Sequence, residues 1–486
     1  MGERRDDELG KMWEKSWVES KKVWHIAGPA ILTSLAQFSV NFATIAFVGH
    51  LGDLELAAVS IVQSVIEGFA FAVMSCLCSA KLIVHVNQLG MGSALETLCG
   101  QAVGAGKLNM LGIYMQRSWI ITCVTGLFLL PIYIFASPLL KLLHQSHPMS
   151  NLAGKYCIWV IPQLFAYAVN FPLEKFFQSQ SKVWVMAIIS MVVFAIHILL
   201  GWLLVFKLGH GLVGAAIAGN VSWCLLAFTQ LVYAVSGRFR DAWTGFSLSA
   251  LKSLSGFVKL SLASAIMVCL EFWYYTAMIL LVGRLKNPEI AVGAISICVN
   301  LHLWTMMIAL GFNIAVSVRV SNELGAGHPG AAKFSVVVAA ATSMFFAIIF
   351  CTTILSTGNH FPKLFTNKPL VVKETSKLRY LLASTILLNG ILPVLNGVAV
   401  GAGWQFQVAL ISIACYYIFG IPFGALLAFR FNLGVQGIWS GMVAGAFLLT
   451  VILVFIILYR TNWHQEALQA EERIKRWGGP AETQLY

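Results

Sequence analysis

Charged residues are scarce in this chain. Asp, Glu, Lys and Arg make up 11% of its 486 residues, and 58% are hydrophobic, whereas a soluble domain averages about 25% charged residues. A soluble core of this length cannot bury so much apolar surface, and the same excess excludes a disordered chain. Because apolar runs recur from residue 28 to residue 459, we predict an all-α polytopic membrane protein that resides in a lipid bilayer.

Sequence features of enzymes and of cofactor binding are also lacking. The ten Cys are scattered and form no paired framework. The GAGHPG stretch at 325–330 fits G-x-G-x-x-G but follows a membrane helix, and GAGK at 104–107 lacks the first glycine and the hydroxyl residue of a phosphate-binding loop. We therefore expect no enzyme activity, no cofactor and no metal. The net charge of +12 is placed in tails and at helix ends, so it does not indicate a nucleic-acid partner.

Apolar periodicity predicts about twelve transmembrane helices. They are expected at 28–49, 54–74, 118–140, 156–173, 184–206, 212–235, 256–283, 289–311, 332–355, 380–401, 407–428 and 434–459. With the N-terminus in the cytosol, the inner segments carry 20 Lys and Arg and the outer loops 11. This asymmetry favours cytosolic termini.

The longest polar interior connection separates six spans from six. The predicted organisation is a cytosolic tail (1–27), an N-lobe (28–236), a linker (237–255), a C-lobe (256–459) and a second cytosolic tail (460–486). An internal repeat supports this division. Its matched positions include Gly49 with Gly283, Gly104 with Gly325, Pro172 with Pro393, and Gly211 with Gly434. Matches in the same order imply a parallel repeat of two six-helix lobes.

The offset of the repeat drops by 13 residues between Met74 and Leu89. The stretch 75–88 is expected to be an extra segment of the N-lobe, because it places Lys81 and His85 where a membrane helix would continue. A cation at mid-bilayer costs roughly 2.5–3.5 kcal/mol. This segment is therefore predicted to bulge out of the second helix or to displace it.

Four long motifs make the chain recognisable. They are SALETLCGQAVGAGKLNMLGIYMQRSW, RVSNELGAGHPGAAK, GVAVGAGWQ and CYYIFGIPFG, at 93–119, 319–333, 397–405 and 415–424. In this order they resemble the plant-type multidrug and toxic compound extrusion (MATE) family, also called DETOXIFICATION proteins. The resemblance implies the MATE fold and a secondary antiporter that exports organic compounds from the cytosol against a cation gradient, usually protons in plants.

Glu271 is the first candidate for proton coupling. It lies in KLSLASAIMVCLEFWYYTAMILLVGRL, far from both ends of a predicted span, and an acidic residue at that depth indicates function. Burial favours the protonated carboxyl, so the group can take a proton from one side and release it to the other. The alternative is a structural hydrogen bond within the lobe. The resemblance supports coupling, because a glutamate on the first C-lobe helix has that role in plant-type members.

Amide and aromatic side chains are the candidates for the substrate cavity. In the C-lobe they are Tyr274, Tyr275, Asn300, Asn389 and Asn396, and in the N-lobe Gln37, Asn41 and Asn170. Such groups stack on planar polyphenols and hydrogen-bond to them, but each of them also serves to join helices. Asn389 departs from the family, because many relatives carry an aspartate there.

Three acidic or basic positions remain open. Glu67 is a second acidic residue within a predicted span. It either has a gating or cavity role or forms a structural pair. Arg319 and Glu323 are expected in a cytosolic loop, where their spacing of four allows an ion pair on one helical face.

The resulting hypothesis is a monomeric, proton-coupled antiporter for multidrug or xenobiotic efflux. The LLNGILPVLNGVAVGAGWQ form at 387–405 is similar to the branch that includes vacuolar flavonoid carriers, so we expect a flavonoid or other secondary metabolite as substrate and the vacuolar rather than the plasma membrane. One alternative is a chloride or organic-anion pathway through the same lobes. Another is a variant that the 75–88 segment makes inactive.

Overall fold

The structure is a computed structural model. It describes residues 2–67, 94–142, 145–251, 288–358, 360–365 and 369–477, together with Tyr274, Ala277, Leu281 and Val282. All regular elements in these ranges are helices. Nine are long and apolar enough to cross a membrane, or up to ten if the bent pair α7 and α8 is one span. Ten predicted spans thus have a helical counterpart, whereas the spans predicted at 54–74 and 256–283 lie partly or mostly outside the described residues.

The chain forms two compact units. Unit 1 comprises residues 1–31 and 266–471, and unit 2 comprises residues 32–265 and 472–486. Helix α1 (Gly2–Gly49) begins in unit 1 and continues into unit 2. The predicted cytosolic tail at 1–27 is therefore helical wherever it is described.

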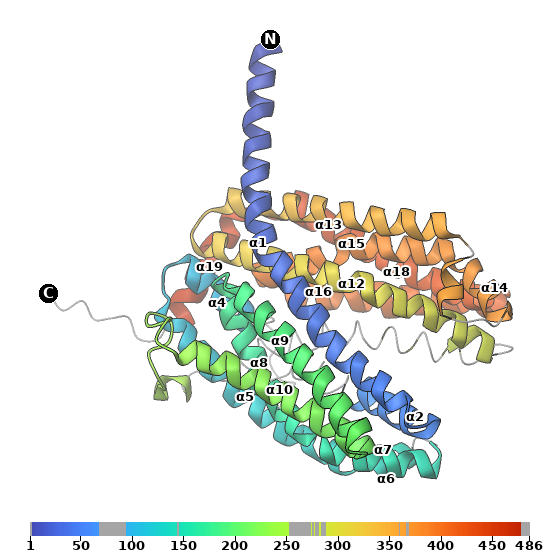
Figure 1. Ribbon diagram of the computed structural model, residues 1–486. Helices are drawn as coiled ribbons and strands as arrows, with labels where there is room; N and C mark the ends of the chain where they lie inside the picture. The colour runs from blue at the N-terminus through green and yellow to red at the C-terminus, as the bar shows by residue number, and fades with distance from the viewer. Residues whose placement is uncertain are drawn as a thin grey trace. The chain divides into compact units, whose positions relative to one another are not determined.

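Unit 2 is built from helices that run alongside one another (Figure 1). After α1 they are α2 (Asp53–Ile61), η1 (Val62–Glu67), α4 (Ala94–Gly104), α5 (Asn109–Ile134), α6 (Ala136–Leu142), α7 (His147–Trp159), α8 (Ile161–Ser179), α9 (Val183–Gly201), η2 (Trp202–Lys207), α10 (Gly211–Val235) and η3 (Leu248–Leu251). Their shared core includes Tyr167 and Trp223, whose rings meet edge to face at 4.6 Å. Such aromatic pairs stabilise packing beyond the apolar area that they bury.

The segment that follows α10 docks on α5. The backbone amide of Gly112 donates to Ala242 O at 2.9 Å. Gln116 donates to Gly245 O and accepts from the amide of Ser247, both at 2.9 Å. These bonds satisfy backbone groups of a polar connection that would otherwise be exposed at the end of the bundle.

Unit 1 contains the start of α1 and the C-terminal helices. These are α12 (Pro288–Gly325), α13 (Pro329–Thr357), η4 (Phe361–Leu364), α14 (Pro369–Lys377), α15 (Arg379–Ala402), α16 (Gln405–Ser412), η5 (Ile413–Gly420), α17 (Ile421–Ala425), η6 (Leu426–Arg430), α18 (Gly434–Phe455), η7 (Ile456–Arg460) and the first part of α19 (Trp463–Trp477). Helices α12, α13, α15 and α18 extend in the same general direction (Figure 1).

A glycine seam joins α18 to the η5–α17 helix. A Cβ at Gly441 would lie 2.3 Å from Gly424 Cα and 2.6 Å from Gly420 O. At this distance two backbones touch, and any side chain would have to push a helix away. Small residues that allow such close approach are typical of membrane helix pairs.

Matched glycines of the predicted repeat have the same local geometry. Gly106 and Gly327, which follow the matched helices α4 and α12, both adopt the left-handed conformation, with φ of 72° and 74°. Their amides donate to the carbonyls three residues earlier at 3.0 and 3.1 Å. Gly211 and Gly434, which open α10 and α18, share a φ of 53°. The two halves therefore end and begin corresponding helices with the same turns, each at a glycine because L side chains avoid positive φ.

The seam predicts a stability difference between two glycines. Gly441→Ala should lower the free energy of unfolding by about 1–3 kcal/mol, because the new methyl group overpacks a backbone contact. Gly330→Ala is the matched control, since nothing lies within 4 Å of its Cβ position. Thermal unfolding of the purified variants in detergent measures both, and an unchanged midpoint for Gly441→Ala would contradict the seam.

Candidate functional site

A buried carboxylate is the centre of the polar site in unit 2. Glu174 on α8 lies in the interior of the unit. Its Oε1 accepts a hydrogen bond from Gln37 Nε2 at 2.6 Å and from Asn170 Nδ2 at 2.8 Å. Asn170 and Glu174 are one helical turn apart, so they share a face. Two predicted cavity residues thus meet on an acid that was not among the predicted site residues.

The neighbouring Lys175 faces a different acid. Its Nζ lies 2.6 Å from Glu96 Oε2 and 3.1 Å from Gln178 Oε1. Glu96 is buried within α4. The buried carboxylate is tolerated because an ammonium group pairs with it.

A histidine joins three helices of unit 2. His197 Nε2 lies 3.1 Å from Thr44 Oγ1, and His197 Nδ1 lies 3.0 Å from Ser222 Oγ. Each hydroxyl also donates to a carbonyl of its own helix, at 3.1 and 2.7 Å. Since a hydroxyl has one proton, only an imidazole protonated on both nitrogens satisfies all four bonds. A neutral ring requires one hydroxyl to turn from its carbonyl.

A small cavity lies between these two polar groups. It has room for no more than about one water molecule. Its lining residues are Gln37, Val40, Ser190, Val193, Ser222, Trp223 and Leu226. Within the described ranges, Ser190 Oγ and Trp223 Nε1 are buried without a hydrogen-bond partner. Gln37, which binds Glu174, and Ser222, which binds His197, thus border the same cavity.

Unit 1 has a second small cavity between α15, η5 and α18. It is lined by Tyr274, Thr385, Leu388, Asn389, Leu392, Tyr416, Met442, Val443 and Ala446. The rings of Tyr274 and Tyr416 stack with centroids 4.4 Å apart, and the Tyr274 hydroxyl donates to Gly441 O at 3.4 Å. Tyr274 and Asn389, both predicted as cavity residues, thus line one space with aromatic and amide groups.

Asn389 has a buried histidine as its neighbour. Its amide nitrogen lies 3.0 Å from His302 Nε2 and 3.3 Å from His302 Nδ1. His302 is fully enclosed in α12. An amide hydrogen bonds a ring nitrogen only when that nitrogen carries no proton. Which ring nitrogen accepts from Asn389 therefore depends on the tautomer of His302.

The remaining predicted residues are spread over both units. Asn396 is buried in α15, and its Oδ1 has no partner within the described part of the chain. Asn300 is exposed on α12 and donates to Ser296 O at 2.9 Å, and Asn41 is half-buried on α1. Glu271 and Tyr275 lie outside the described residues, as does the 75–88 segment, and only the backbone of Glu67, at the end of η1, is described.

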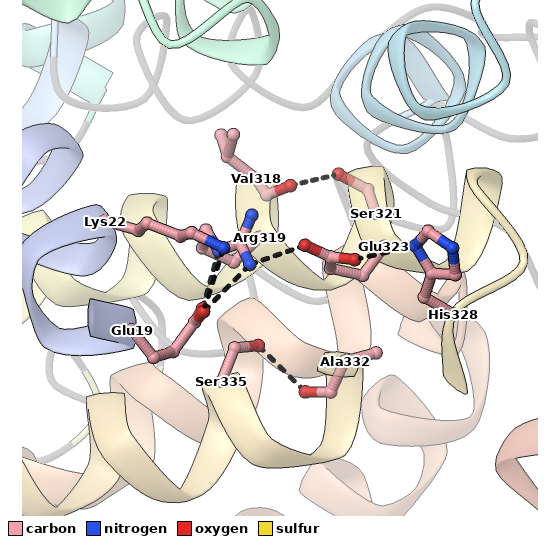
Figure 2. Close-up of polar contacts among 9 residues, drawn as sticks. All are labelled: Glu19, Lys22, Val318, Arg319, Ser321, Glu323, His328, Ala332 and Ser335. Atoms are coloured by element: carbon pink, nitrogen blue, oxygen red, sulfur yellow. Dashed lines mark hydrogen bonds and ion pairs between the residues drawn. The ribbon is translucent and has the colours of Figure 1, made fainter. Parts of the chain in front are cut away.

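The predicted pair Arg319 and Glu323 is part of a larger charge cluster in unit 1 (Figure 2). Arg319 Nε lies 2.7 Å from Glu19 Oε1, and Arg319 Nη2 lies 3.1 Å from Glu19 Oε2 and 2.5 Å from Glu323 Oε1. Glu323 also faces His328 at 3.3 Å, and Lys22 lies 3.6 Å from Glu19. The spacing-based prediction of the pair is confirmed. The expected loop is wrong, because α12 extends through both residues to Gly325.

Three participants were missed by sequence reasoning, namely Glu174, His302 and Glu19. Glu174 follows the predicted span 156–173 by one residue, so it was counted as loop. His302 lies within the apolar run 289–311 and was a usable signal, since a titratable group at that depth indicates function or a paired polar contact. Glu19 had no local signal, because its partner lies 300 residues away.

No group of three or more His, Cys, Asp or Glu in the described ranges is arranged to hold a metal ion. The described side chains of both units offer hydrogen bonds, aromatic rings and titratable groups. One cluster joins the carboxyl of Glu174 to two amides, and the other joins His302 to the amide of Asn389. Such clusters in apolar surroundings suit the transient binding of protons and of polar, planar solutes.

The sequence of this chain is similar to those of known transporters. The sequence model of the MatE family matches residues 29–203 and 263–426. Protein DETOXIFICATION 33 of Arabidopsis thaliana is 55% identical over 473 residues, covering 97% of this chain and 95% of that protein. Protein DETOXIFICATION 29 of the same plant is 52% identical over 462 residues, covering 95% and 89%.

Solved structures agree with the sequence comparison. The crystal structure of the eukaryotic MATE transporter AtDTX14 superposes with a TM-score of 0.86 at 33% identity, covering 94% of this chain and 99% of that one. A MATE transporter of Vibrio cholerae, VcmN, in the bent form, gives a TM-score of 0.75 at 19% identity, covering 94% and 99%. The second likeness concerns the fold alone.

The charge cluster predicts a large loss of stability when its cation is removed. Arg319→Met should lower the free energy of unfolding by about 3–5 kcal/mol, because two largely buried carboxylates lose the guanidinium that they share. Lys377→Met is the matched control, since its 2.6 Å pair with Glu374 is about half exposed and should contribute roughly 0–1 kcal/mol. Thermal unfolding of both variants in detergent compares them, and equal shifts would show that the cluster is no more than a surface contact.

Proposed function

Because this chain belongs to the MatE family and is a multi-pass membrane transporter of the efflux type, we propose that it exchanges organic solutes for protons. The observation that carries the proposal is the cavity of unit 1, where Asn389 meets the buried His302 beside two stacked tyrosine rings. Such a site combines groups for a planar solute with a neighbour that can change its protonation state.

Glu271 is the proposed proton-coupling residue. It precedes Tyr274 by three residues, and the predicted helix over 256–283 places both on one face. Tyr274 lines the cavity of Asn389. Protonation of Glu271 would then change the hydrogen bonding around the solute and favour one access state over the other. Asn389 cannot ionise, so its proposed role is to orient the solute or the carboxyl.

Unit 2 offers a second place for a proton. Glu174 is buried with two amide donors, and His197 makes a pair of hydroxyl contacts that only its doubly protonated form satisfies completely. The small cavity between Gln37 and Ser222 lies between these two groups. We assign both groups a proton-binding role that accompanies the transport cycle, with Glu271 as the coupling residue.

The proposed substrate is a flavonoid or another plant secondary metabolite, and the proposed location is the vacuolar membrane. The basis is the branch resemblance of residues 387–405 and the pairing of stacked tyrosines with amides. The transporter is proposed to act as a monomer with an N-lobe at 28–236 and a C-lobe at 256–459. An uptake screen of flavonoids, alkaloids and citrate with and without a pH gradient tests the substrate class.

Two alternatives remain as competing hypotheses. An anion pathway draws support from five cations between residues 363 and 379, and a current that persists without a proton gradient would favour it. An inactive chain draws support from Lys81 in the extra segment 75–88. Deletion of 75–88 tests this hypothesis, because transport that appears only after the deletion would favour it.

The coupling hypothesis predicts the outcome of one substitution. Glu271→Gln should abolish pH-gradient-driven uptake into membrane vesicles, because an amide cannot carry the proton. Glu14→Gln is the control, since Glu14 is exposed on the N-terminal helix. Equal amounts of protein in the vesicles are verified by immunoblot. Full uptake by Glu271→Gln would contradict a coupling role for Glu271.

A second substitution separates the role of unit 2 from that of Glu271. Glu174→Gln keeps a side chain that accepts hydrogen bonds from Gln37 and Asn170, so the variant should fold with a nearly unchanged thermal midpoint. Its uptake should lose most of its dependence on external pH between about 5 and 8, the range in which buried carboxyls and histidines titrate. An unaltered pH profile would leave Glu174 a structural residue.

A further inference from the structure

The N-terminal helix carries an exposed row of three tryptophans. Trp13, Trp17 and Trp24 are 76%, 58% and 37% exposed. Their spacings of four and seven residues bring them to one side of α1, since a helix turns by about 100° per residue. We call these residues the tryptophan face. Large apolar rings are rarely left uncovered in such a row, so the face indicates an interaction surface.

Lysines occupy the opposite side of the same helix. Each of the three tryptophans is preceded, two residues earlier, by a lysine, namely Lys11, Lys15 and Lys22. Two residues correspond to a rotation of about 200° around the helix. All three are exposed. A fourth lysine, Lys21, places its Nζ 5.3 Å from the centroid of the Trp17 ring. A helix with aromatic rings on one side and most of its basic residues on the other is typical of segments that lie in the interface of a membrane.

The helix is held in place by the charge cluster and by buried apolar residues. Glu19 binds Arg319, and Val23 and Ile26 are buried on the same side of α1. The part of α1 before these contacts projects beyond the other helices of unit 1 (Figure 1). Figure 2 shows that Glu19 and Lys22 approach α12 from α1, next to Arg319. The tryptophan face is thus presented by an anchored helix.

The contacts of Trp24 give the tryptophan face its direction. Its ring meets Phe312 at 5.4 Å and Phe346 at 5.6 Å, edge to face. Phe312 precedes Arg319 by seven residues on α12, which is about 10 Å along the helix. The neighbouring Phe345 on α13 is 59% exposed, as suits a lipid-facing position of a membrane protein. The tryptophan face therefore continues the lipid-facing surface of the bundle.

We propose that the tryptophan face binds the phospholipid bilayer that surrounds the transporter, at the depth of the headgroups and upper acyl chains. Tryptophan is enriched at that depth because its ring is apolar and its N–H finds polar partners there. The lysines on the other side point to water or to lipid phosphates. The N-terminal segment is then an anchor at the membrane interface on the predicted cytosolic side, separate from the transport site.

Fluorescence quenching tests this placement in the intact protein. The full chain and the variant Trp13→Phe/Trp17→Phe are reconstituted as single copies in lipid discs, and their difference in emission isolates the two rings. Phosphatidylcholine brominated at carbons 6 and 7 should quench this difference at least about twofold more than lipid brominated at carbons 11 and 12, because an interfacial helix is buried by only about 5–10 Å. The difference for Trp223→Phe is the control, since Trp223 is buried within unit 2.

Three results would overturn the proposal. Absence of quenching by either lipid means that the rings do not reach the bilayer. Stronger quenching by the deeper bromines means a position in the apolar core. Absence of quenching in single-copy discs together with a shift of emission in discs that hold two copies assigns the face to a second chain.

Proteolysis provides an independent measurement. Trypsin should cleave after Lys15 about tenfold faster in Trp13→Ser/Trp17→Ser than in the unaltered chain when both are in phosphatidylcholine discs, because the helix leaves the lipid. Val18→Ser is the matched control, since Val18 is exposed on the same helix but off the tryptophan face. Equal cleavage rates in all three chains would contradict membrane binding.

Discussion

The constraint on which this structure depends is the absence of water around most of the chain. In hydrocarbon, each unsatisfied backbone group costs several kcal/mol, so long helices are the available form. The same cost applies to side chains, and a charge in the apolar interior must have partners. Few charges are therefore present, and those that are buried carry structural or functional meaning.

The buried charges of the two units are satisfied in different ways. In unit 2, Glu174 accepts from two neutral amides, and its charge has no ion-pair partner among the described residues. In unit 1, Arg319 lies between Glu19 and Glu323 and forms a closed ion-pair cluster. An ion pair fixes both charges, whereas amides accept either protonation state of a carboxyl with modest rearrangement. This difference separates residues suited to hold helices together from residues suited to exchange protons.

Much of the architecture was predictable because it depends on local pattern. Apolar periodicity located ten spans that have helical counterparts, and the repeated glycines matched turns with the same backbone conformation in both halves. Helix ends were less accurate. Arg319 was expected in a loop, because polar residues end an apolar run, yet α12 continues to Gly325 and Arg319 pairs with Glu19.

The sequence alone determined the class of protein, the family resemblance, the repeat and most candidate side chains, because each of these follows from composition or from neighbours along the chain. The tertiary structure decided which candidates share a site. Gln37 meets Glu174 across 137 residues, Asn389 meets His302 across 87, and Glu19 meets Arg319 across 300. Such pairs form only where helices pack, and local periodicity, which shows the apolar side of a helix, does not identify the residue that will face it.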